Sequence, residues 1–473
     1  MSIEITRQFI KNEAIRFGAN IDTAYNKSFI ERNNTGKEAL QDDGAYFGFI
    51  SADEEWSGAF HDFSFTIFPS DEGKPWLVCL GIGSNGFKND YELSTYPGLR
   101  RLFSKLIDEE GFCKSDLSDI ETSLPKSLTS NPKLEHLKNT IKKYTKVLPV
   151  CQIVEDPLSE KGKEIISAFL AGYARIREWA SNQQSRNAIS KALNPFLKSS
   201  PINHFEEIKI LLKERKFVIL QGPPGTGKTR MAKKVSEKAK VFFTQFHAET
   251  TYSDFISGIR PSLENASLGY TQNDGKFPEA IKYAIENSDE QVVLIIDEIN
   301  RANLSNVLGP IFYLFEHKMD KSDFELEITP DLKVTELPNN FYVIATMNTA
   351  DRSLAVVDFA LRRRFAWYNL SPQLIEIREF YADDFKKIDE IFNWYATSNE
   401  LALQPGQGYF IASTDEEIMN RIKYEIYPLI REYLQEGLLR NAKEEFNNYF
   451  YNRISQSLFE WKNLLISSVK LAA

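Results

Sequence analysis

The chain has 473 residues, of which 42% are hydrophobic and 26% are charged. These values are typical of an ordinary globular protein, and a chain of this length is expected to form two or three domains. The formal net charge of −9 argues against a protein that coats nucleic acid non-specifically, because the neutralisation of phosphates supplies most of the affinity of such proteins. Any contact with DNA is therefore expected through a local patch or a shaped pocket.

No apolar stretch approaches the ~20 residues that are needed to cross a bilayer, and the N-terminus lacks the basic-then-apolar pattern of a signal peptide. The three cysteines, Cys79, Cys113 and Cys151, lie far apart and match no metal-site spacing, and the 5 histidines are also scattered. We therefore expect a cytoplasmic protein with reduced thiols, no membrane partner and no metal site built from histidine or cysteine.

The first part of the chain, residues 1–150, is expected to be an α+β domain without a phosphate loop. Strands are predicted from short aromatic or β-branched runs at residues 45–50, 63–68 and 76–82, and helices at residues 99–109 and 132–144. The aromatic residues of this part, including Phe63, Phe65 and Trp76, either stack on DNA bases or fill a core. Core packing is the more common role of such residues.

The next part, residues 151–200, is expected to be a helical linker. Apolar residues recur at helical spacing between residues 160 and 179, and the pairs Asn194-Pro195 and Ser200-Pro201 indicate a boundary. The nucleotide-binding part of the chain is therefore expected to begin near residue 201.

The stretch at 217–229, FVILQGPPGTGKT, predicts a buried strand that runs into a glycine-rich turn and then into a helix. It fits the phosphate-binding pattern G-x-x-x-x-G-K-[ST], in which glycines let several backbone N–H groups point at one anion. An ordinary turn with chance glycines is disfavoured, because strand, loop and helix follow in the required order. Lys228 is expected to reach the β- and γ-phosphates, and the Thr229 hydroxyl to hold Mg²⁺. The expected nucleotide-binding residues are Gly222, Pro223, Pro224, Gly225, Thr226, Gly227, Lys228, Thr229 and Arg230.

Further apolar runs follow this motif, with helical patterns between them. Strands are predicted at residues 241–246, 291–296 and 341–346, and a hairpin at residues 324–337. Strands that alternate with helices indicate a parallel sheet, so residues 201–370 are expected to form an α/β nucleotide-binding subdomain. Residues 371–473 are predicted to be mainly helical and to form a lid subdomain.

The predicted strand at 291–296 is followed by two carboxylates, Asp297 and Glu298. Ligands bind outside the carboxyl ends of such strands, next to the phosphate loop. Asp297 is expected to help hold Mg²⁺, and Glu298 to orient and polarise the attacking water. Asn348, after the next strand, is placed to hydrogen-bond the water and the γ-phosphate. A strand that ends in Asp-Glu is a weak signal alone, and it becomes strong after a complete phosphate loop.

Three adjacent arginines, Arg362, Arg363 and Arg364, follow a helix that is predicted over residues 355–361. Such a cluster is either a DNA-binding patch or the source of an arginine finger, a side chain that reaches the nucleotide of a neighbouring subunit. The finger is favoured because a phosphate loop and an Asp-Glu pair precede it, and the sequence leaves open which of the three it is. A finger that acts in trans implies a ring, because a heterologous interface closes into one.

Three segments together resemble the McrB family, the AAA+ motor subunits of modification-dependent (type IV) restriction systems. They are HAETTYSDFISGIRP at 247–261, IIDEINRANLSNVLGPIFYLFEH at 295–317 and MNTADRSLAVVDFALRRRFAW at 347–367. The resemblance covers residues 202–440, and MNTADRS followed by LRRRF separates this group from most other AAA+ ATPases. Farther on, GQGYF at 406–410 resembles the family's Gly-His-Ser-Tyr-Phe loop, from which Gln407 and Gly408 depart.

The resemblance implies an AAA+ P-loop NTPase fold with a helical lid, behind an N-terminal α+β domain that sets which DNA is recognised. It implies a homo-oligomeric ring, expected to be a hexamer, that acts with Mg²⁺ on modified double-stranded DNA and drives a separate McrC-like nuclease. It also implies a preference for GTP over ATP. Residues 348–351 resemble the Asn-Lys-x-Asp element with which GTPases recognise guanine, so Asp351 joins the expected nucleotide-binding residues.

The chain is not expected to cut DNA by itself. Nucleases of one large class carry a P-D…[DE]-x-K constellation. Pro330-Asp331 is followed here by Glu336, but the lysine is missing.

Two other functions fit the same phosphate chemistry. One is a MoxR-like ATPase chaperone that remodels a protein partner, which the acidic net charge favours. The other is a nucleotide-gated binding scaffold without turnover, which the intact Lys228, Asp297 and Glu298 disfavour. The restriction motor is preferred because of the three matching segments.

Overall fold

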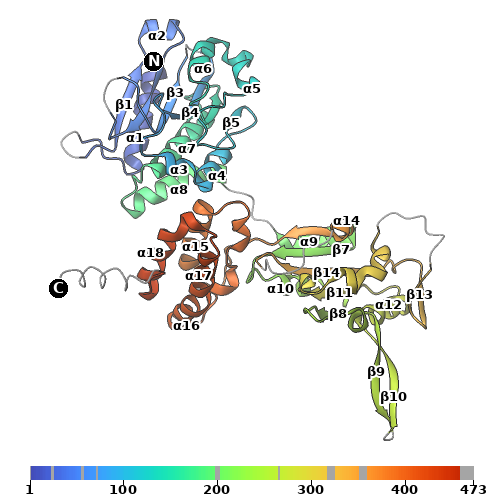
Figure 1. The fold of residues 1–473 in the computed structure, drawn as a ribbon. Coiled ribbons are helices and arrows are strands. Elements are labelled where there is room, and N and C mark those ends of the chain that lie inside the picture. The colour runs from blue at the N-terminus through green and yellow to red at the C-terminus, as the bar shows by residue number, and fades with distance from the viewer. Residues whose placement is uncertain are drawn as a thin grey trace, which may run out of the picture. The chain divides into compact units, whose positions relative to one another are not determined.

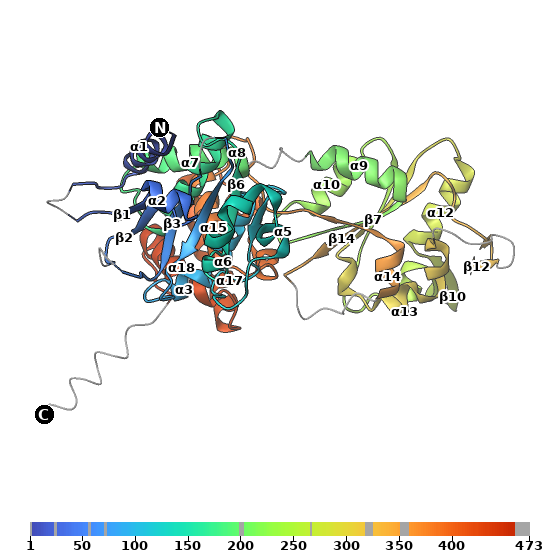
Figure 2. The ribbon, with the colours of Figure 1, turned by 90° about the horizontal axis from the view of Figure 1, so that it is seen from above.

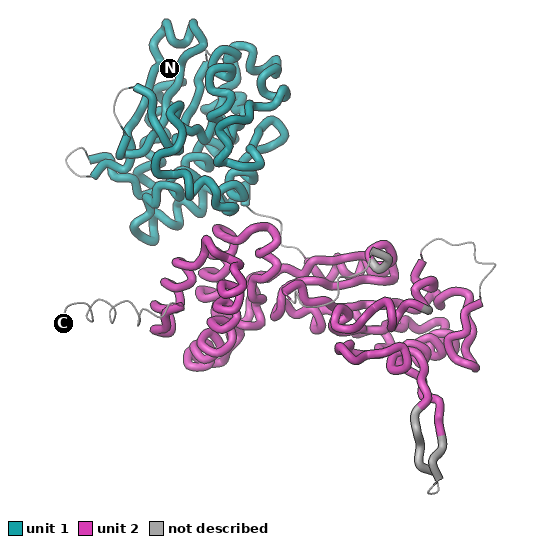
Figure 3. Tube along the Cα trace, viewed as in Figure 1, with its two compact units in different colours: residues 1–201 teal, residues 202–473 magenta. Residues whose placement is uncertain are grey.

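The computed structural model describes residues 2–22, 26–54, 58–70, 73–197, 203–264, 267–316, 325–350 and 359–458. The chain divides into two compact units, Met1–Pro201 and Ile202–Ala473, each with buried hydrophobic residues of its own (Figure 1, Figure 3). No helix among the described residues is long and apolar enough to cross a membrane.

The first unit is built on one sheet with the strand order β1-β2-β3-β4-β6-β5, in which all neighbouring strands are antiparallel. Its elements are α1 Ser2–Arg16, β1 Phe29–Asn34, α2 Lys37–Gln41, β2 Tyr46–Ser51, β3 Phe63–Phe68, β4 Trp76–Ile82, α3 Tyr91–Ser94, α4 Pro97–Lys105, β5 Gly111–Cys113, α5 Lys126–Thr129, η1 Pro132–Leu137, α6 Lys138–Tyr144, β6 Val150–Val154, α7 Glu160–Ile176 and α8 Gln183–Leu197.

Both faces of the sheet of the first unit are covered by helices. This agrees with the sequence of β4, which is apolar throughout and favours burial on both sides. All residues of β4 are buried, and successive side chains of a strand point to opposite faces. Leu77 and Cys79 pack with Leu137 and Ile141 of η1 and α6 on one face. On the other face α7 packs against β3 and β4. Phe63, Phe65 and Trp76 are buried in this unit, which favours core packing over base stacking for these three residues.

The first unit extends beyond residue 150, where the sequence analysis ended it. β6 pairs with both β4 and β5 inside the sheet, and α7, which was expected to be linker, is buried along most of its length. α8 continues through Pro195, which was expected to mark a boundary. The strand partners of β6 are far away in the sequence, so no local pattern revealed that residues 150–197 complete this fold.

One buried ion pair joins the end of α7 to the sheet. The Arg177 guanidinium lies 2.7 Å from the Asp90 carboxylate, and these side chains are 12% and 8% exposed. Arg177 also donates to the Phe63 carbonyl oxygen at 2.6 Å and to the Tyr173 hydroxyl at 3.2 Å. Since Asp90 in turn accepts from the Phe63 N–H at 2.8 Å, the pair satisfies the backbone at the start of β3.

Removing one partner of this pair should destabilise the first unit strongly. We expect Asp90→Ala to lower the free energy of unfolding of the first unit by about 3–5 kcal/mol, because the Arg177 charge stays buried without its carboxylate. Glu135→Ala, which removes an exposed partner of Lys138, should change it by less than ~1 kcal/mol. Urea unfolding of the full-length chain measures both, and equal effects of the two changes would contradict this account.

The second unit combines a sheet with a helical part. Its elements are α9 His204–Arg215, β7 Phe217–Gly222, α10 Lys228–Val235, β8 Lys240–Gln245, α11 Tyr252–Phe255, β9 Ser257–Glu264, β10 Ser267–Asp274, α12 Lys276–Glu286, β11 Val292–Asp297, η2 Ile299–Arg301, α13 Leu304–Leu308, η3 Gly309–Phe315, β12 Leu326–Thr329, β13 Leu332–Val334, β14 Phe341–Asn348, α14 Phe359–Arg364, β15 Ala366–Asn369, α15 Ala382–Tyr395, η4 Glu400–Leu403, η5 Gln407–Phe410, α16 Asp415–Arg421, the π-helical turn η6 Ile422–Ile426, α17 Tyr427–Gln435, η7 Arg440–Ala442 and α18 Lys443–Ile454.

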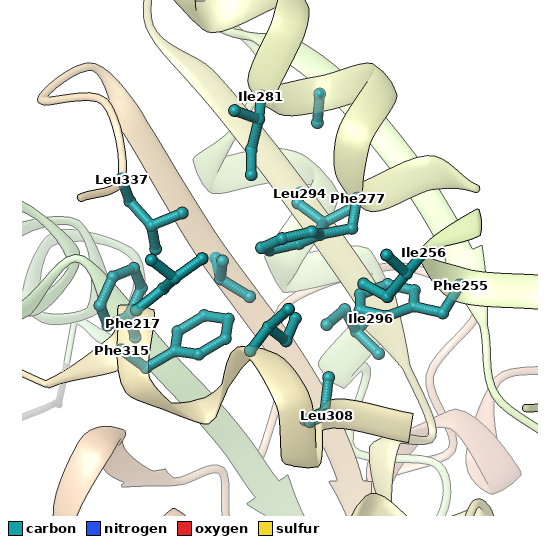
Figure 4. Close-up of a cluster of buried hydrophobic side chains, with 14 of the residues drawn as sticks. Phe217, Phe255, Ile256, Phe277, Ile281, Leu294, Ile296, Leu308, Phe315 and Leu337 are labelled. Atoms are coloured by element: carbon teal, nitrogen blue, oxygen red, sulfur yellow. The ribbon is translucent and has the colours of Figure 1, made fainter. Parts of the chain in front are cut away.

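The five-stranded sheet of the second unit is parallel, with the order β15-β7-β14-β11-β8. This confirms the predicted α/β fold. Helices α9 and α10 cover one face (Figure 2), and their apolar side chains pack against the sheet there. The other face packs against α12, α13 and η3, and Figure 4 shows this cluster, which includes Phe217, Leu294 and Phe315. Because all strands run in the same direction, their carboxyl ends meet at one edge, where the predicted site residues lie.

Three features of the second unit differ from the prediction or add to it. β15 was not predicted, and it extends the sheet beside β7. The hairpin of β9 and β10 was also missed, whereas the hairpin of β12 and β13 was expected. Helices α15 to α18 pack around a separate hydrophobic cluster, which includes Phe392, Ile426 and Phe446, as a lid subdomain would.

Candidate nucleotide-binding site

The phosphate loop joins the end of β7 to the start of α10 and depends on its glycines. Gly225 and Gly227 have φ angles of 79° and 82°, a region that residues with a Cβ rarely enter. A Cβ at Gly222 would lie 2.2 Å from the carbonyl oxygen of Leu370, which directly follows β15. The backbone conformation therefore requires glycine at two positions of the loop, and close packing requires it at a third.

Lys228 begins α10 and reaches back across the loop. Its ammonium group is buried and donates to the carbonyl oxygens of Gly222 at 2.9 Å and of Pro223 at 2.8 Å. Pro223 and Pro224 have no N–H, so the donors that the loop offers begin at Gly225. An anion bound here would meet the ammonium group, these N–H groups and the positive end of the α10 dipole.

Asp297, the last residue of β11, joins the phosphate loop to the neighbouring strand. Its Oδ1 accepts a hydrogen bond from the Thr229 hydroxyl at 2.7 Å and another from the Thr346 hydroxyl at 2.5 Å. Hydroxyl and carboxylate oxygens suit Mg²⁺, which commonly binds one or two carboxylates and takes its other ligands from phosphates and water. Thr229 and Asp297 therefore fit a Mg²⁺ site. Within the described ranges, no group of three or more His, Cys, Asp or Glu residues is placed to hold a metal ion.

Glu298 follows β11 in a left-handed backbone conformation, with φ 53° and ψ 47°. Such a conformation costs a non-glycine residue about 1–3 kcal/mol and persists only where the surroundings hold it. The Glu298 N–H donates to the Thr346 hydroxyl at 3.1 Å, and the Glu298 carboxylate forms an ion pair with Arg301. Thr346 therefore aligns both carboxylate residues, since its hydroxyl accepts from Glu298 and donates to Asp297.

Asn348 ends β14 and lies opposite Gly222 in the sheet register, at the same edge as the carboxylates. Its carbonyl oxygen accepts from the Asn300 side chain at 3.4 Å. Asn300 is buried, and its Oδ1 has no hydrogen-bond partner among the described residues. A buried acceptor of this kind fits a site that takes a polar ligand. Asn300, Arg301 and Thr346 were not among the predicted site residues, although Asn300 and Arg301 follow the Asp-Glu pair by two and three residues and Thr346 lies two residues before Asn348.

The three adjacent arginines have different surroundings. They form the last turn of α14 rather than following a helix. Arg364 is 12% exposed and forms an ion pair with Glu316. Arg362 lies over the ring of Trp367 at 5.3 Å. Arg363 is 73% exposed and lies 3.7 Å from Glu316. Arg362 and Arg363 are therefore both exposed, whereas Arg364 is largely covered.

A cavity of about 900 Å³ lies beside the phosphate loop and is large enough for a nucleoside. The loop, α10, the segment after β15 and the loop around Gln407 line it. Apolar side chains such as Met231 and Ile375 alternate there with polar ones such as Arg230 and Gln373. This mixture is typical of a cofactor pocket, in which apolar groups contact a base and a few polar groups orient it.

The structure places Lys228, Thr229, Asp297, Glu298 and Asn348 at one edge of the sheet. Asp351 and most of the helix predicted over residues 355–361 lie outside the described residues. The Pro330-Asp331 pair lies in the turn between β12 and β13. There hydrogen bonds from Lys282 and Thr329 lower the pKa of the Asp331 carboxyl to about 2.

A family model described as an AAA domain of the dynein-related subfamily matches residues 217–365. The chain is also 36% identical over 275 residues to the type IV methyl-directed restriction enzyme EcoKMcrB subunit of Escherichia coli (strain K12), a match that covers 51% of this chain and 59% of that protein. The chain carries a McrB-like AAA domain. This domain and its parallel sheet are those of an AAA+ P-loop NTPase.

A second relative of the McrB-like chain is the type II restriction enzyme BsuMI component YdiS of Bacillus subtilis (strain 168). It is 30% identical over 191 residues, which are 32% of this chain and 55% of that protein. The matched part of the chain thus spans little more than half the length of either relative. A crystal structure from Cytophaga hutchinsonii ATCC 33406, at 17% identity, covers 52% of this chain and 76% of its own with a TM-score of 0.27, which is too low to support any statement.

Lys228 should be essential for nucleotide binding. We expect Lys228→Ala to weaken the binding of GTP and ATP analogues at least ~100-fold, because the site loses its buried positive charge. Lys238→Ala, which removes an exposed lysine just beyond α10, should leave binding unchanged. Calorimetric titration of both variants measures this, and near-normal affinity of the Lys228 variant would show that the loop is not the phosphate site.

Proposed function

We propose that this chain is the NTP-hydrolysing subunit of a modification-dependent restriction system. In this proposal it hydrolyses GTP in preference to ATP, recognises marked double-stranded DNA and drives a separate McrC-like nuclease in the cytoplasm. The observation that carries the proposal is the hydrogen-bonded group of Thr229, Asp297, Thr346 and Glu298 beside a complete phosphate loop.

Each residue of the site has a distinct task in this proposal. The loop N–H groups and Lys228 hold the β- and γ-phosphates, and Thr229 and Asp297 would hold Mg²⁺, which neutralises charge on the phosphates when it is bound. Glu298 orients the attacking water, and Asn348 hydrogen-bonds the water and the γ-phosphate. The Thr346 hydroxyl keeps both carboxylates at the strand edge.

Arg363 is the proposed finger, supplied to the nucleotide of the neighbouring subunit in a ring, which we expect to be a hexamer. Its side chain is 73% exposed and makes only a 3.7 Å contact with Glu316, whereas Arg364 is 12% exposed beside Glu316 and Arg362 lies over the Trp367 ring. A positive side chain that approaches the transferred phosphoryl group from a second subunit stabilises the charge of the transition state.

The two relatives support a role in restriction. One is described as a methyl-directed restriction enzyme subunit and the other as a component of a type II restriction enzyme. The preference for GTP is implied by the resemblance to the McrB family. In this proposal the first unit sets which DNA is recognised. The chain alone does not cut DNA. A MoxR-like chaperone is the second candidate, which the net charge of −9 favours.

The finger can be tested by mixing two inactive variants. We expect Arg363→Ala to bind nucleotide normally and to lose turnover ~10³-fold or more, because transition-state charge is no longer neutralised. Glu298→Gln should also bind and not turn over. Mixed rings should regain part of the activity, since some interfaces then combine an intact Glu298 with an intact Arg363. Arg215→Ala, an exposed arginine at the end of α9, is the control that should behave as wild type. A mixture as inactive as its parts would argue against catalysis shared between subunits.

DNA recognition can be tested with the full-length chain and a non-hydrolysable GTP analogue. We expect binding to duplexes that carry modified bases at least ~10-fold tighter than to the same unmodified duplexes at equal salt. Competition between GTP and ATP is measured in the same samples. A strong preference for ATP together with no DNA binding at low salt would favour the chaperone instead.

A further inference from the structure

The lid loop around Gln407 lies directly against the phosphate loop. Three donors of the lid loop bind three consecutive carbonyl oxygens of the phosphate loop. The Gly406 N–H donates to Pro224 at 2.9 Å, the Gly408 N–H donates to Gly225 at 2.8 Å, and the Gln407 side-chain amide donates to Thr226 at 2.9 Å. Two of these contacts come from the backbone, and only the third depends on a side chain.

These three bonds orient three peptide groups. In a planar trans peptide, the carbonyl oxygen of one residue and the N–H of the next point in opposite directions. A lid that holds the carbonyls of residues 224, 225 and 226 therefore turns the N–H groups of Gly225, Thr226 and Gly227 away from itself. These N–H groups are the first donors that the loop has after its two prolines. The lid loop thus supplies hydrogen-bond donors to the three carbonyl oxygens. The three N–H groups of the phosphate loop stay available for a bound phosphate.

The approach of the two loops is close enough to exclude side chains. A Cβ at Gly406 would lie 2.2 Å from the Gly225 carbonyl carbon, and a Cβ at Gly408 would lie 2.9 Å from the Gly225 oxygen. On the phosphate-loop side, a Cβ at Gly225 would lie 2.7 Å from the Tyr409 ring. The fit between the loops therefore requires glycine on both sides.

The other end of the Gln407 amide is anchored as well. Gln407 is buried, and its Oε1 accepts from the Gln373 N–H at 3.3 Å. Both ends of the Gln407 amide are therefore hydrogen-bonded, one to the phosphate loop and one to the segment after β15.

We propose that Gln407 is a positioning residue for the phosphate loop: it holds the Thr226 carbonyl so that the Gly227 N–H faces a bound phosphate. The inference rests on the proposed nucleotide hydrolysis and adds a residue that acts on the loop without touching the reacting atoms. Since Gln407 acts through the loop and not on the base, its effect is the same for every nucleoside triphosphate.

The test compares two buried glutamines of the same segment. Gln407→Ala should weaken the binding of non-hydrolysable GTP and ATP analogues by the same factor, roughly 10-fold, because one hydrogen bond that orients the loop is lost. Gln404→Ala is the matched control, since the Gln404 amide bonds Asp389 of α15 at 2.9 Å and does not reach the phosphate loop. It should lower the melting temperature of the lid but leave the affinity for nucleotide unchanged.

The outcomes separate the inference from the function on which it rests. If the wild-type chain binds neither analogue, the proposed function fails. If the wild type binds and Gln407→Ala binds equally well, only the inference fails. Equal losses in the Gln404 and Gln407 variants would also overturn it, because they would show a general effect of a weakened lid. A loss confined to one nucleotide would overturn it by showing that Gln407 contacts the base.

Discussion

The second unit depends on a single carboxylate that is shared between two hydroxyls. Asp297 accepts from Thr229 at the start of α10 and from Thr346 in β14. This places the ends of three elements, β11, β14 and α10, within one hydrogen-bonded group. A parallel sheet brings strand ends to one edge, but it does not set them to the accuracy that phosphate chemistry requires. The shared carboxylate sets this alignment, and the left-handed Glu298 beside it follows from the same contacts.

A second constraint acts on the backbone of the phosphate loop. A loop that points its N–H groups inward must point its carbonyl oxygens elsewhere, and buried carbonyls need donors. Lys228 donates hydrogen bonds to the carbonyl oxygens of residues 222 and 223. The lid loop around Gln407 donates to those of residues 224, 225 and 226. The lid is therefore part of the phosphate site in structural terms, even though it lies far along the chain. Movement of the lid would change the loop directly, without an intermediate element.

The first unit is held together by different interactions. Its antiparallel sheet is buried on both faces, and one buried ion pair between Asp90 and Arg177 satisfies the backbone at the start of β3. A buried charge pair of this kind gains little net stability, but the loss of one partner leaves the other charge buried and uncompensated. The pair therefore holds the end of α7 against the start of β3.

Most of the chemistry of the site was predictable from the sequence, because it depends on residues that are close together along the chain. The glycines of the loop, Lys228, Thr229 and the Asp297-Glu298 pair are dictated by local backbone geometry and by strand ends. The boundary near residue 150 was predicted wrongly, because β6 is short and its partners β4 and β5 lie far away in sequence. β15 was missed for the same reason, since a four-residue strand carries too little periodicity.

The sequence by itself therefore determined that this protein has a phosphate loop followed by a parallel sheet with acidic strand ends. Three further matters were decided by the tertiary structure alone: which of the three arginines is covered, which hydroxyl aligns the two carboxylates, and which lid side chain donates to the phosphate loop. The reason is physical. A glycine turn or an apolar strand is encoded by neighbouring residues. The surroundings of Arg364, Thr346 and Gln407 arise from contacts between elements that only folding brings together.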